Sequence, residues 1–389
     1  MPHSAHLQSG SPTDSTTEDR LCGSEKEVSN LTTATATKRL PTSLTGRVAA
    51  AKIAYSARRV RHQALVVVDD GAPRSGDLVL ARVDRLGQHD KLQLPSGRRA
   101  DLFPGDEIVV SYGHRYAPDQ FEAEVPDDLS PCHLVAAGGI AARELCRHTS
   151  MSAPTEITPI GLLGSAEGRR SNLADWALGA PLSSAGRPPT IAVVGTCMNA
   201  GKTTTAANLI RGLVAGGRTV GAAKVTGTAA GGDTWLMLDA GAAVALDFTD
   251  AGFPTTYQAS PTEVEEIFET LTGHLAASGV DTVVLEIADG LFQRETEVLL
   301  GSTTFSGGVD AVLFAAGDAL AATAGVDWLE RRGVGVSGIS GVLMSSPLAI
   351  RETELATGLP VLTIELLRDP EQAARFRVRR PPDSGRAAE

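Results

Sequence analysis

The sequence of 389 residues predicts an α/β protein, in which a small β-rich, barrel-like domain precedes a mostly parallel, doubly wound sheet. Beyond residue 190, short apolar runs alternate with helical stretches, the order expected of a parallel sheet with helices on both faces. Before it, the apolar runs are separated by turn residues instead. A glycine-bounded loop connects the first apolar run of the second part to a helix-forming segment. These three observations give the fold class.

The N-terminal residues, 1 to about 46, are rich in Ser, Thr, Gly and charged residues and show almost no periodic apolar signal. Such a segment buries too little apolar surface to offset the entropy lost on ordering. We therefore expect residues 1–46 to form a disordered tail.

The next part, residues 47–178, is expected to be the small β-rich domain. Turn residues such as Asp70-Gly71 and Pro104-Gly105 separate its short runs, a pattern that predicts a small antiparallel barrel. The runs lie at 64–68, 77–83, 91–94 and 107–111. An Ala-rich stretch at 134–146 is expected to be helical, with a break at Gly138-Gly139. Pro and Ser residues in 179–189 predict an interdomain linker.

Residues 190–369 are expected to form the doubly wound domain, and the Arg-, Pro- and Glu-rich residues 370–389 a frayed tail. The apolar runs predict strands at 190–194, 219–225, 244–247, 281–287, 310–315, 336–343 and 361–365. The stretches between them predict helices at 202–216, 233–241, 261–278, 318–332 and 347–357.

The glycine-bounded loop reads Gly195-Thr-Cys-Met-Asn-Ala-Gly-Lys-Thr203 and predicts a phosphate-binding P-loop. Glycines let backbone N–H groups converge on phosphate oxygens, Lys202 can reach the outer phosphates, and Thr203 can offer its hydroxyl to Mg²⁺. The strict pattern has a glycine where Thr196 stands, so the loop is a variant. A chance Gly-Lys-Thr in an ordinary turn is the alternative, and the flanking strand and helix favour the P-loop. The predicted nucleotide-binding residues are Gly195, Thr196, Asn199, Ala200, Gly201, Lys202, Thr203 and Thr204.

Other candidate residues stand where the predicted strands end, because ligands of an open parallel sheet bind outside the carboxyl ends of its strands. Lys224 lies near the end of the apolar run at 219–225; a lysine whose stem lies along the sheet edge with its head in water is the alternative. Asp233 begins a predicted helix and is expected to be a metal ligand, an N-cap, or both. Glu286 ends the run that begins at 281, where a second carboxylate for Mg²⁺ is expected. Asp289 and Arg294 follow as pocket candidates of second rank.

The loop and these residues resemble the motifs of dethiobiotin synthetase and its P-loop NTPase relatives, the SIMIBI-type branch. The resemblance extends over about residues 190–365. The resemblance implies that Lys202 and Thr203 bind phosphates and Mg²⁺, that Asp233 and Glu286 complete the metal site, and that Lys224 lies beside a substrate carbamate or carboxylate. The predicted catalytic residues are then Lys202, Lys224 and Glu286, and the predicted metal ligands Thr203, Asp233 and Glu286.

The sequence also departs from the dethiobiotin synthetase pattern. Cys197 replaces an aspartate of that family, and Glu286 is followed by Ile-Ala-Asp-Gly instead of a glycine-rich stretch. Ser345 and Ser346 stand near the place of an asparagine that reads the nucleotide base. Biotin synthesis is therefore not expected, and ATP is favoured as the cofactor with GTP left open.

The composition limits the partners. A net charge of −11 argues against nucleic-acid binding, which relies on a basic surface. The sequence has neither an apolar run of about 20 residues nor a signal-peptide pattern, so we expect a cytoplasmic protein that does not bind membranes. A small anionic substrate is the expected partner, and a homodimer is compatible with the sequence.

Together these features predict an ATP- and Mg²⁺-dependent enzyme that phosphorylates or activates a small carboxylate or related oxyanion, with or without a ligation step. The alternative is a nucleotide-hydrolysing switch whose N-terminal domain binds a protein partner. A switch of the partition-protein kind would carry an extra lysine early in the P-loop, where Met198 and Asn199 stand. The enzyme is therefore favoured.

Overall fold

A computed structural model describes residues 44–69, 71–180 and 186–377 of the chain. Most of the expected N-terminal tail, the middle of the expected linker and the last residues of the chain lie outside these ranges. The described residues belong to one compact unit of the chain. Residues 44–46, expected in the tail, already belong to helix α1 (Leu44–Ala50).

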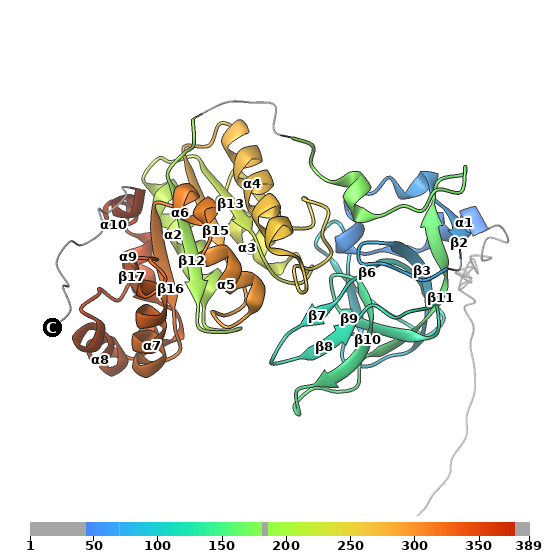
Figure 1. Cartoon of the computed structure of the whole chain (residues 1–389), viewed down its shortest axis with the longest axis horizontal. Helices are drawn as coiled ribbons and strands as arrows, with labels where there is room; N and C mark the ends of the chain where they lie inside the picture. Colours follow the sequence, from blue (N-terminus) through green and yellow to red (C-terminus); the bar gives the residue numbers. More distant parts are fainter. Residues whose placement is uncertain (1–43, 70, 181–185, 378–389) are drawn as a thin grey trace, which may run out of the picture. The chain divides into compact units, whose positions relative to one another are not determined.

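The N-terminal part is a β-structure closed into a ring (Figure 1). Its sheet has the order β1-β6-β3-β11-β9-β10-β8-β7, β2 pairs with β11, and an additional β6–β10 pairing closes the ring β6-β3-β11-β9-β10. The strands are β1 (Lys52–Ile53), β2 (Val66–Asp69), β3 (Leu78–Arg85), β6 (Glu107–Tyr112), β7 (Arg115–Tyr116), β8 (Phe121–Glu124), β9 (Cys132–Ala136), β10 (Ile140–Arg147) and β11 (Thr155–Gly164). A separate hairpin is formed by β4 (Lys91–Gln93) and β5 (Arg99–Asp101).

The predicted barrel is thus confirmed, with one correction to its topology. Most neighbouring strands are antiparallel, but β10 and β1 both pair with β6 in parallel. The barrel core follows the two-residue period of a strand: Val79 of β3 belongs to one apolar cluster, and its neighbours Leu78 and Leu80 to another. Short 3-10 helices complete this part at Tyr55–Ala57, His62–Ala64 and Leu173–Trp176.

The expected helix at 134–146 is wrong, because this stretch forms β9 and β10. The two strands pair antiparallel around a turn in which Gly139 has a φ of 95°. A Cβ at Gly139 would lie 2.1 Å from the Cβ of Ala54. Burial in the closed ring outweighs the helix propensity of the alanines, which is a weak local preference.

The C-terminal part is an α/β domain whose six strands are all parallel, in the order β14-β13-β15-β12-β16-β17. The strands are β12 (Thr190–Gly195), β13 (Val220–Lys224), β14 (Val244–Asp247), β15 (Thr282–Glu286), β16 (Ala311–Ala315) and β17 (Gly338–Ser340). The helices are α2 (Lys202–Ala215), α3 (Gly232–Asp239), α4 (Pro261–Ala277), α5 (Arg294–Leu300), α6 (Thr303–Gly308), α7 (Ala319–Glu330), α8 (Pro347–Thr357), α9 (Ile364–Arg368) and α10 (Pro370–Ala374).

Helices cover both faces of this sheet, as predicted (Figure 1). Ile191 and Val193 of β12 pack in a cluster with residues of α2, α3, α9 and α10. Ala192 and Val194 point the other way, into a cluster with residues of α4, α5, α6 and α7. The central strand β12 is buried along its whole length, so the loop that follows it leaves the sheet at its centre.

Two expectations at the C-terminal end are wrong. The expected strand at 361–365 is reduced to an isolated parallel bridge between Val361 and Ile339, because Thr363 caps helix α9. The expected fraying from residue 370 does not begin there, since α10 follows a cap at Asp369 and buries Ala373 fully. Residues 378–389 lie outside the described residues.

The two parts of the chain pack against each other. Val135 and Ile140 of the barrel share an apolar cluster with Ala229 and Phe248 of the α/β domain. A Cβ at Gly138 would lie only 1.9 Å from the backbone oxygen of Ala229, so the two backbones are in direct contact. No helix within the described ranges is long and apolar enough to cross a membrane.

Candidate nucleotide-binding site

The loop between β12 and α2 has the backbone geometry that its glycines predict. Gly201 is the N-cap of α2, with a φ of 98°, and a Cβ there would lie 2.8 Å from the Cα of Gly341. A Cβ at Gly195 would lie 2.8 Å from the Cγ of Lys202. Both positions therefore exclude a side chain, one by backbone conformation and close approach, the other by the path of the lysine.

The side chain of Lys202 turns back under the loop. Its Nζ donates to the backbone oxygen of Cys197 at 2.7 Å and to the backbone oxygen of Asp289. Burial lowers the pKa of Lys202, and the carboxylates of Glu286 and Asp289 oppose this shift. A buried lysine held between backbone carbonyls is placed to meet a strong anion such as a phosphate.

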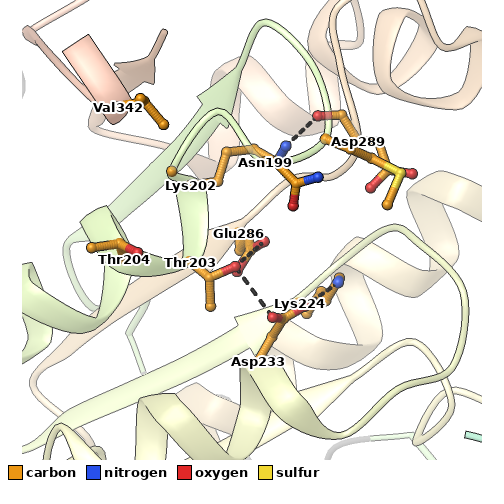
Figure 2. Close-up of a pocket in the computed structure, with 11 residues that line it drawn as sticks. Asn199, Lys202, Thr203, Thr204, Lys224, Asp233, Glu286, Asp289 and Val342 are labelled. Carbon is orange, nitrogen blue, oxygen red and sulfur yellow. Dashed lines mark hydrogen bonds and ion pairs between the residues drawn. The ribbon is translucent and has the colours of Figure 1, made fainter. Parts of the chain in front are cut away.

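Thr203 lies between two carboxylates, as Figure 2 shows. Its Oγ1 is 3.2 Å from Asp233 Oδ1 and 3.0 Å from Glu286 Oε1. Asp233 stands in the first turn of α3, and Glu286 is the last residue of β15. The strand order brings these residues together, because β15 is the neighbour of β12 in the sheet.

Glu286 has the features expected of a metal ligand. Its Oε2 is buried and has no hydrogen-bond partner in the described part of the chain. Burial, to which the Asp233 carboxylate adds, raises the pKa of Glu286 to about 7. A hydroxyl and two carboxylates suit Mg²⁺, which takes few protein oxygens and completes its shell with water and phosphate. The described residues hold no group of three or more His, Cys, Asp or Glu side chains suited to a metal ion.

Lys224 forms an ion pair with Asp233 Oδ2 at the end of β13. Only 9% of Lys224 is exposed, which rules out the alternative of a lysine with its head in water. Burial acts to lower the pKa of Lys224, but the carboxylates of Asp233, Glu286 and Asp289 outweigh it and raise that pKa. Burial acts to raise the pKa of Asp233, and Lys224 outweighs it, so that this pKa is lowered.

These side chains line a cavity of about 350 Å³. Its walls contain Met198, Asn199, Gly201, Lys202, Thr203, Thr204, Lys224, Asp233, Glu286, Asp289 and Val342. Of the other predicted residues, Gly195, Thr196 and Ala200 belong to the loop but do not line the cavity, and Arg294 begins α5 without lining it. The structure thus brings most of the predicted site together.

A second cavity of about 440 Å³ shares Gly201, Thr204 and Val342 with the first. It extends to Met344, Ser345 and the start of α9 at Thr363, Ile364 and Glu365. The backbone N–H of Val342 donates to the oxygen of Ala200 at 3.0 Å, which fixes the segment after β17 against the loop. Sequence reasoning placed Ser345 near the base of a nucleotide but missed Val342, which carries no chemical signal.

The barrel contributes two charged residues near the loop that the sequence did not reveal. The side-chain amide of Asn199 donates to Asp119. The buried guanidinium of Arg115 donates to Gln120 Oε1 at 2.7 Å. Burial lowers the pKa of Arg115 to about 10, and the charges of Asp289 and Asp119 oppose this shift. Only the packing of the barrel against the α/β domain brings these groups near, so no local motif could have indicated them.

Of the comparisons with known proteins, the one between structures finds matches to this chain, and those between sequences do not. No family model matches the sequence, and no curated protein matches it. Among solved structures, the chain is similar to the 54 kDa signal recognition particle protein of Aeropyrum pernix K1 in complex with GDP, with 18% identity and a TM-score of 0.35. That match covers 49% of this chain and 44% of the other, so the chain spans less than half of that protein.

Two further structures are similar at the same level. The kinase domain of the Escherichia coli tyrosine kinase ETK matches with 14% identity and a TM-score of 0.31, covering 39% of this chain and 66% of that one. Chloroplast FtsY from Physcomitrella patens matches with 17% identity and a TM-score of 0.33, covering 53% of this chain and 70% of that one. The likeness is distant, and the P-loop-type α/β fold rests on this chain's own strand order and loop. The resemblance to dethiobiotin synthetase stays a prediction.

Proposed function

We propose that this protein binds ATP together with Mg²⁺ and transfers the γ-phosphoryl group to a small carboxylate or related oxyanion. The observation that carries the proposal is the hydroxyl of Thr203 between the carboxylates of Asp233 and Glu286, with Glu286 Oε2 buried and unpartnered. This arrangement directly follows Lys202 at the start of α2. A cation site beside a phosphate-binding loop is the pairing that phosphoryl transfer requires.

Different residues of the site would bind the phosphates, the metal ion and the nucleoside. Lys202 and the backbone N–H groups of the loop would hold the β- and γ-phosphates. Thr203, Asp233 and Glu286 would hold Mg²⁺, which when bound neutralises charge on the phosphate oxygens. The second cavity, which adjoins the loop at Gly201, has room for the nucleoside.

The acceptor would bind where Lys224 and Asp289 line the first cavity. An anionic acceptor must approach an anionic phosphate, so a cation beside both lowers the repulsion between them. Lys224 is suited to this because it is buried, and a buried charge acts strongly over a short distance. Its ion pair with Asp233 also connects the acceptor side of the cavity to the metal side.

The experiment is a screen of small carboxylates for stimulated release of ADP from MgATP. We expect slow basal hydrolysis and at least one carboxylate that stimulates turnover, since an enzyme of this kind protects the phosphoryl group from water. Lys202→Ala should abolish both rates while the fold is kept. Turnover in Lys202→Ala equal to that of the natural protein would refute the site.

A nucleotide-hydrolysing switch is the second candidate, because residues of the barrel contact the segment that carries Asp233. Gln93 accepts a hydrogen bond from the backbone of Gly231, and Tyr55 lies beside Thr234. A protein partner bound to the barrel could act on the nucleotide site through these contacts. Stimulation by a protein partner, with none by small molecules, would favour the switch over the enzyme.

A further inference from the structure

Two barrel side chains contact the segment that carries Asp233. Gln93, the last residue of β4, accepts a hydrogen bond through Oε1 from the backbone N–H of Gly231 at 2.8 Å. Tyr55 places its hydroxyl 3.0 Å from Thr234 Oγ1. These contacts lie two residues before Asp233 and one residue after it, so they bracket the expected metal ligand.

Packing at Gly231 leaves no space for a side chain at the start of α3. A Cβ at this position would lie 2.6 Å from Tyr55 Cε2, 2.9 Å from Gln93 Nε2 and 2.9 Å from Trp235 Nε1. Side chains of the barrel and of α3 therefore pack around the Cα of Gly231, the N-cap residue of α3. Glycine is the residue that permits this contact.

Tyr55 is itself held firmly. Its hydroxyl donates to Asp247 Oδ2 at 2.8 Å, and its ring stacks under the guanidinium of Arg58, 4.2 Å from the ring centroid. Arg58 donates to Asp247 Oδ1 at 3.0 Å and to Asp250 Oδ2 at 2.5 Å. Asp247 ends β14, directly opposite Lys224 in β13. The network therefore fixes Tyr55 to the end of β14, the neighbour of the strand β13 that carries Lys224.

We propose that Tyr55 and Gln93 are positioning residues, which hold Asp233 against Thr203 and Glu286 and so make the barrel a part of the Mg²⁺ site. The inference rests on the proposed function for its metal and nucleotide. It assigns to the barrel a role in the chemistry of the α/β domain, through contacts that involve neither the P-loop nor the substrate.

The physical reason is preorganisation. Asp233 stands on the first turn of α3, which is only eight residues long, and a helix of this length is marginal by itself. Each bond that fixes the N-terminus of α3 removes conformational freedom that the site would otherwise lose on binding the metal. Loss of one such bond should weaken Mg²⁺ binding about fivefold, which corresponds to a net hydrogen bond of about 1 kcal/mol.

The first experiment measures the Mg²⁺ concentration that half-saturates ATP binding, in the full chain. We expect Tyr55→Phe and Gln93→Met each to raise it about fivefold, with ATP binding recovered at saturating Mg²⁺. The matched control is Tyr116→Phe, which removes a barrel hydroxyl from a residue that stacks on Tyr257 and should change nothing. The same concentration in all four proteins, or an equal rise in the control, would overturn the inference.

The second experiment needs no nucleotide. Amide hydrogen exchange over residues 231–239 should be faster in Tyr55→Phe and in Gln93→Met than in the natural protein or in Tyr116→Phe. Unchanged exchange in both variants would overturn the inference. If the natural protein binds no MgATP, the proposed function fails and exchange alone decides whether these residues position α3. If Tyr55→Phe does not fold, Gln93→Met still gives both readouts.

Discussion

Asp233 and Glu286 both lie within hydrogen-bond distance of the Thr203 hydroxyl, yet their surroundings shift their pKa values in opposite directions. Lys224 holds the pKa of Asp233 below its usual range, whereas burial raises the pKa of Glu286 to about 7. The positions of both acids could be predicted, Glu286 at the end of a strand and Asp233 at the start of a helix, because ligands of a parallel sheet bind outside the carboxyl ends of its strands. The pairing of Lys224 with Asp233 could not, since the choice of an ion-pair partner depends on side-chain geometry that a sequence pattern does not contain.

The raised pKa of Glu286 predicts a pH-dependent cost to stability when Mg²⁺ is absent. The ordinary pKa of a glutamate carboxyl is 4.5. Between this pH and about 7, the folded protein holds a proton on Glu286 that the unfolded chain has lost. The contribution of Glu286 to the free energy of unfolding therefore falls as the pH rises. Glu286→Gln removes the ionisation. As the pH rises from 5 to 8, the free energy of unfolding of the variant should therefore increase by about 1–3 kcal/mol relative to that of the natural protein. Thermal unfolding at the two pH values checks this, and an equal difference at both would contradict it.

The buried pair of Lys224 and Asp233 predicts the effect of losing the lysine. Lys224→Met leaves Asp233 and Glu286 as neighbouring carboxylates without that cation, which should destabilise the fold by about 3–5 kcal/mol. Because a divalent cation can replace the lost charge, Mg²⁺ should reverse part of the decrease in melting temperature of the variant. Thermal unfolding with and without Mg²⁺ is the measurement. A variant as stable as the natural protein in the absence of Mg²⁺ would show that the pair contributes nothing.

At the scale of elements, the sequence predicted β12, α2 and the strands that carry the site, because each combines a long periodic signal with a cap or glycine. It missed α5 and α6, which are short and lie between stronger signals. It also mistook β9 and β10 for a helix, because their alanines are buried by pairing of these strands with each other and with β6 and β11, which lie outside the stretch 134–146. Local pattern cannot reveal contacts that only tertiary structure supplies.

Helix α10 offers a test of an element that the sequence placed in a frayed tail. Ala373 is fully buried in the cluster formed with α2, and Phe376 packs against the same cluster. Truncation after residue 369 should therefore lower the free energy of unfolding by about 1–3 kcal/mol through lost apolar burial. Truncation after residue 377 keeps α10 and is the control for chemical denaturation. If both truncations have the same stability, α10 does not contribute to the core.

At the scale of the whole molecule, buried charges connect the barrel to the α/β domain. Arg58 lies between Asp247 and Asp250, of which only 1% and 4% are exposed. A charged contact of this kind between distant segments could not be predicted from the sequence, because the partner of an arginine side chain depends on tertiary packing. The pattern of apolar runs predicted two parts, but not that residues of both parts share an apolar cluster.

Arg58→Ala should leave two buried carboxylates without their main cation. We expect a loss of about 3–5 kcal/mol in the free energy of unfolding, because an unpaired buried charge is costly. Neutralising the acids as well, in Arg58→Ala with Asp247→Asn and Asp250→Asn, should recover part of the loss. Chemical denaturation of the full chain measures both. A single variant within about 0.5 kcal/mol of the natural protein would mean that the network adds nothing to stability.

The central claim is that Thr203, Asp233 and Glu286 form a Mg²⁺ site beside a nucleotide-binding loop. Calorimetric titration of ATP into the protein, with and without Mg²⁺, tests it most directly, with Glu286→Gln as the variant and Glu330→Gln, on an exposed helix end, as the matched control. We expect Mg²⁺ to tighten ATP binding at least about tenfold in the natural protein and in the control, and to have little effect in Glu286→Gln. An ATP affinity that Mg²⁺ enhances equally in all three proteins, or no binding of ATP at all, would contradict the claim.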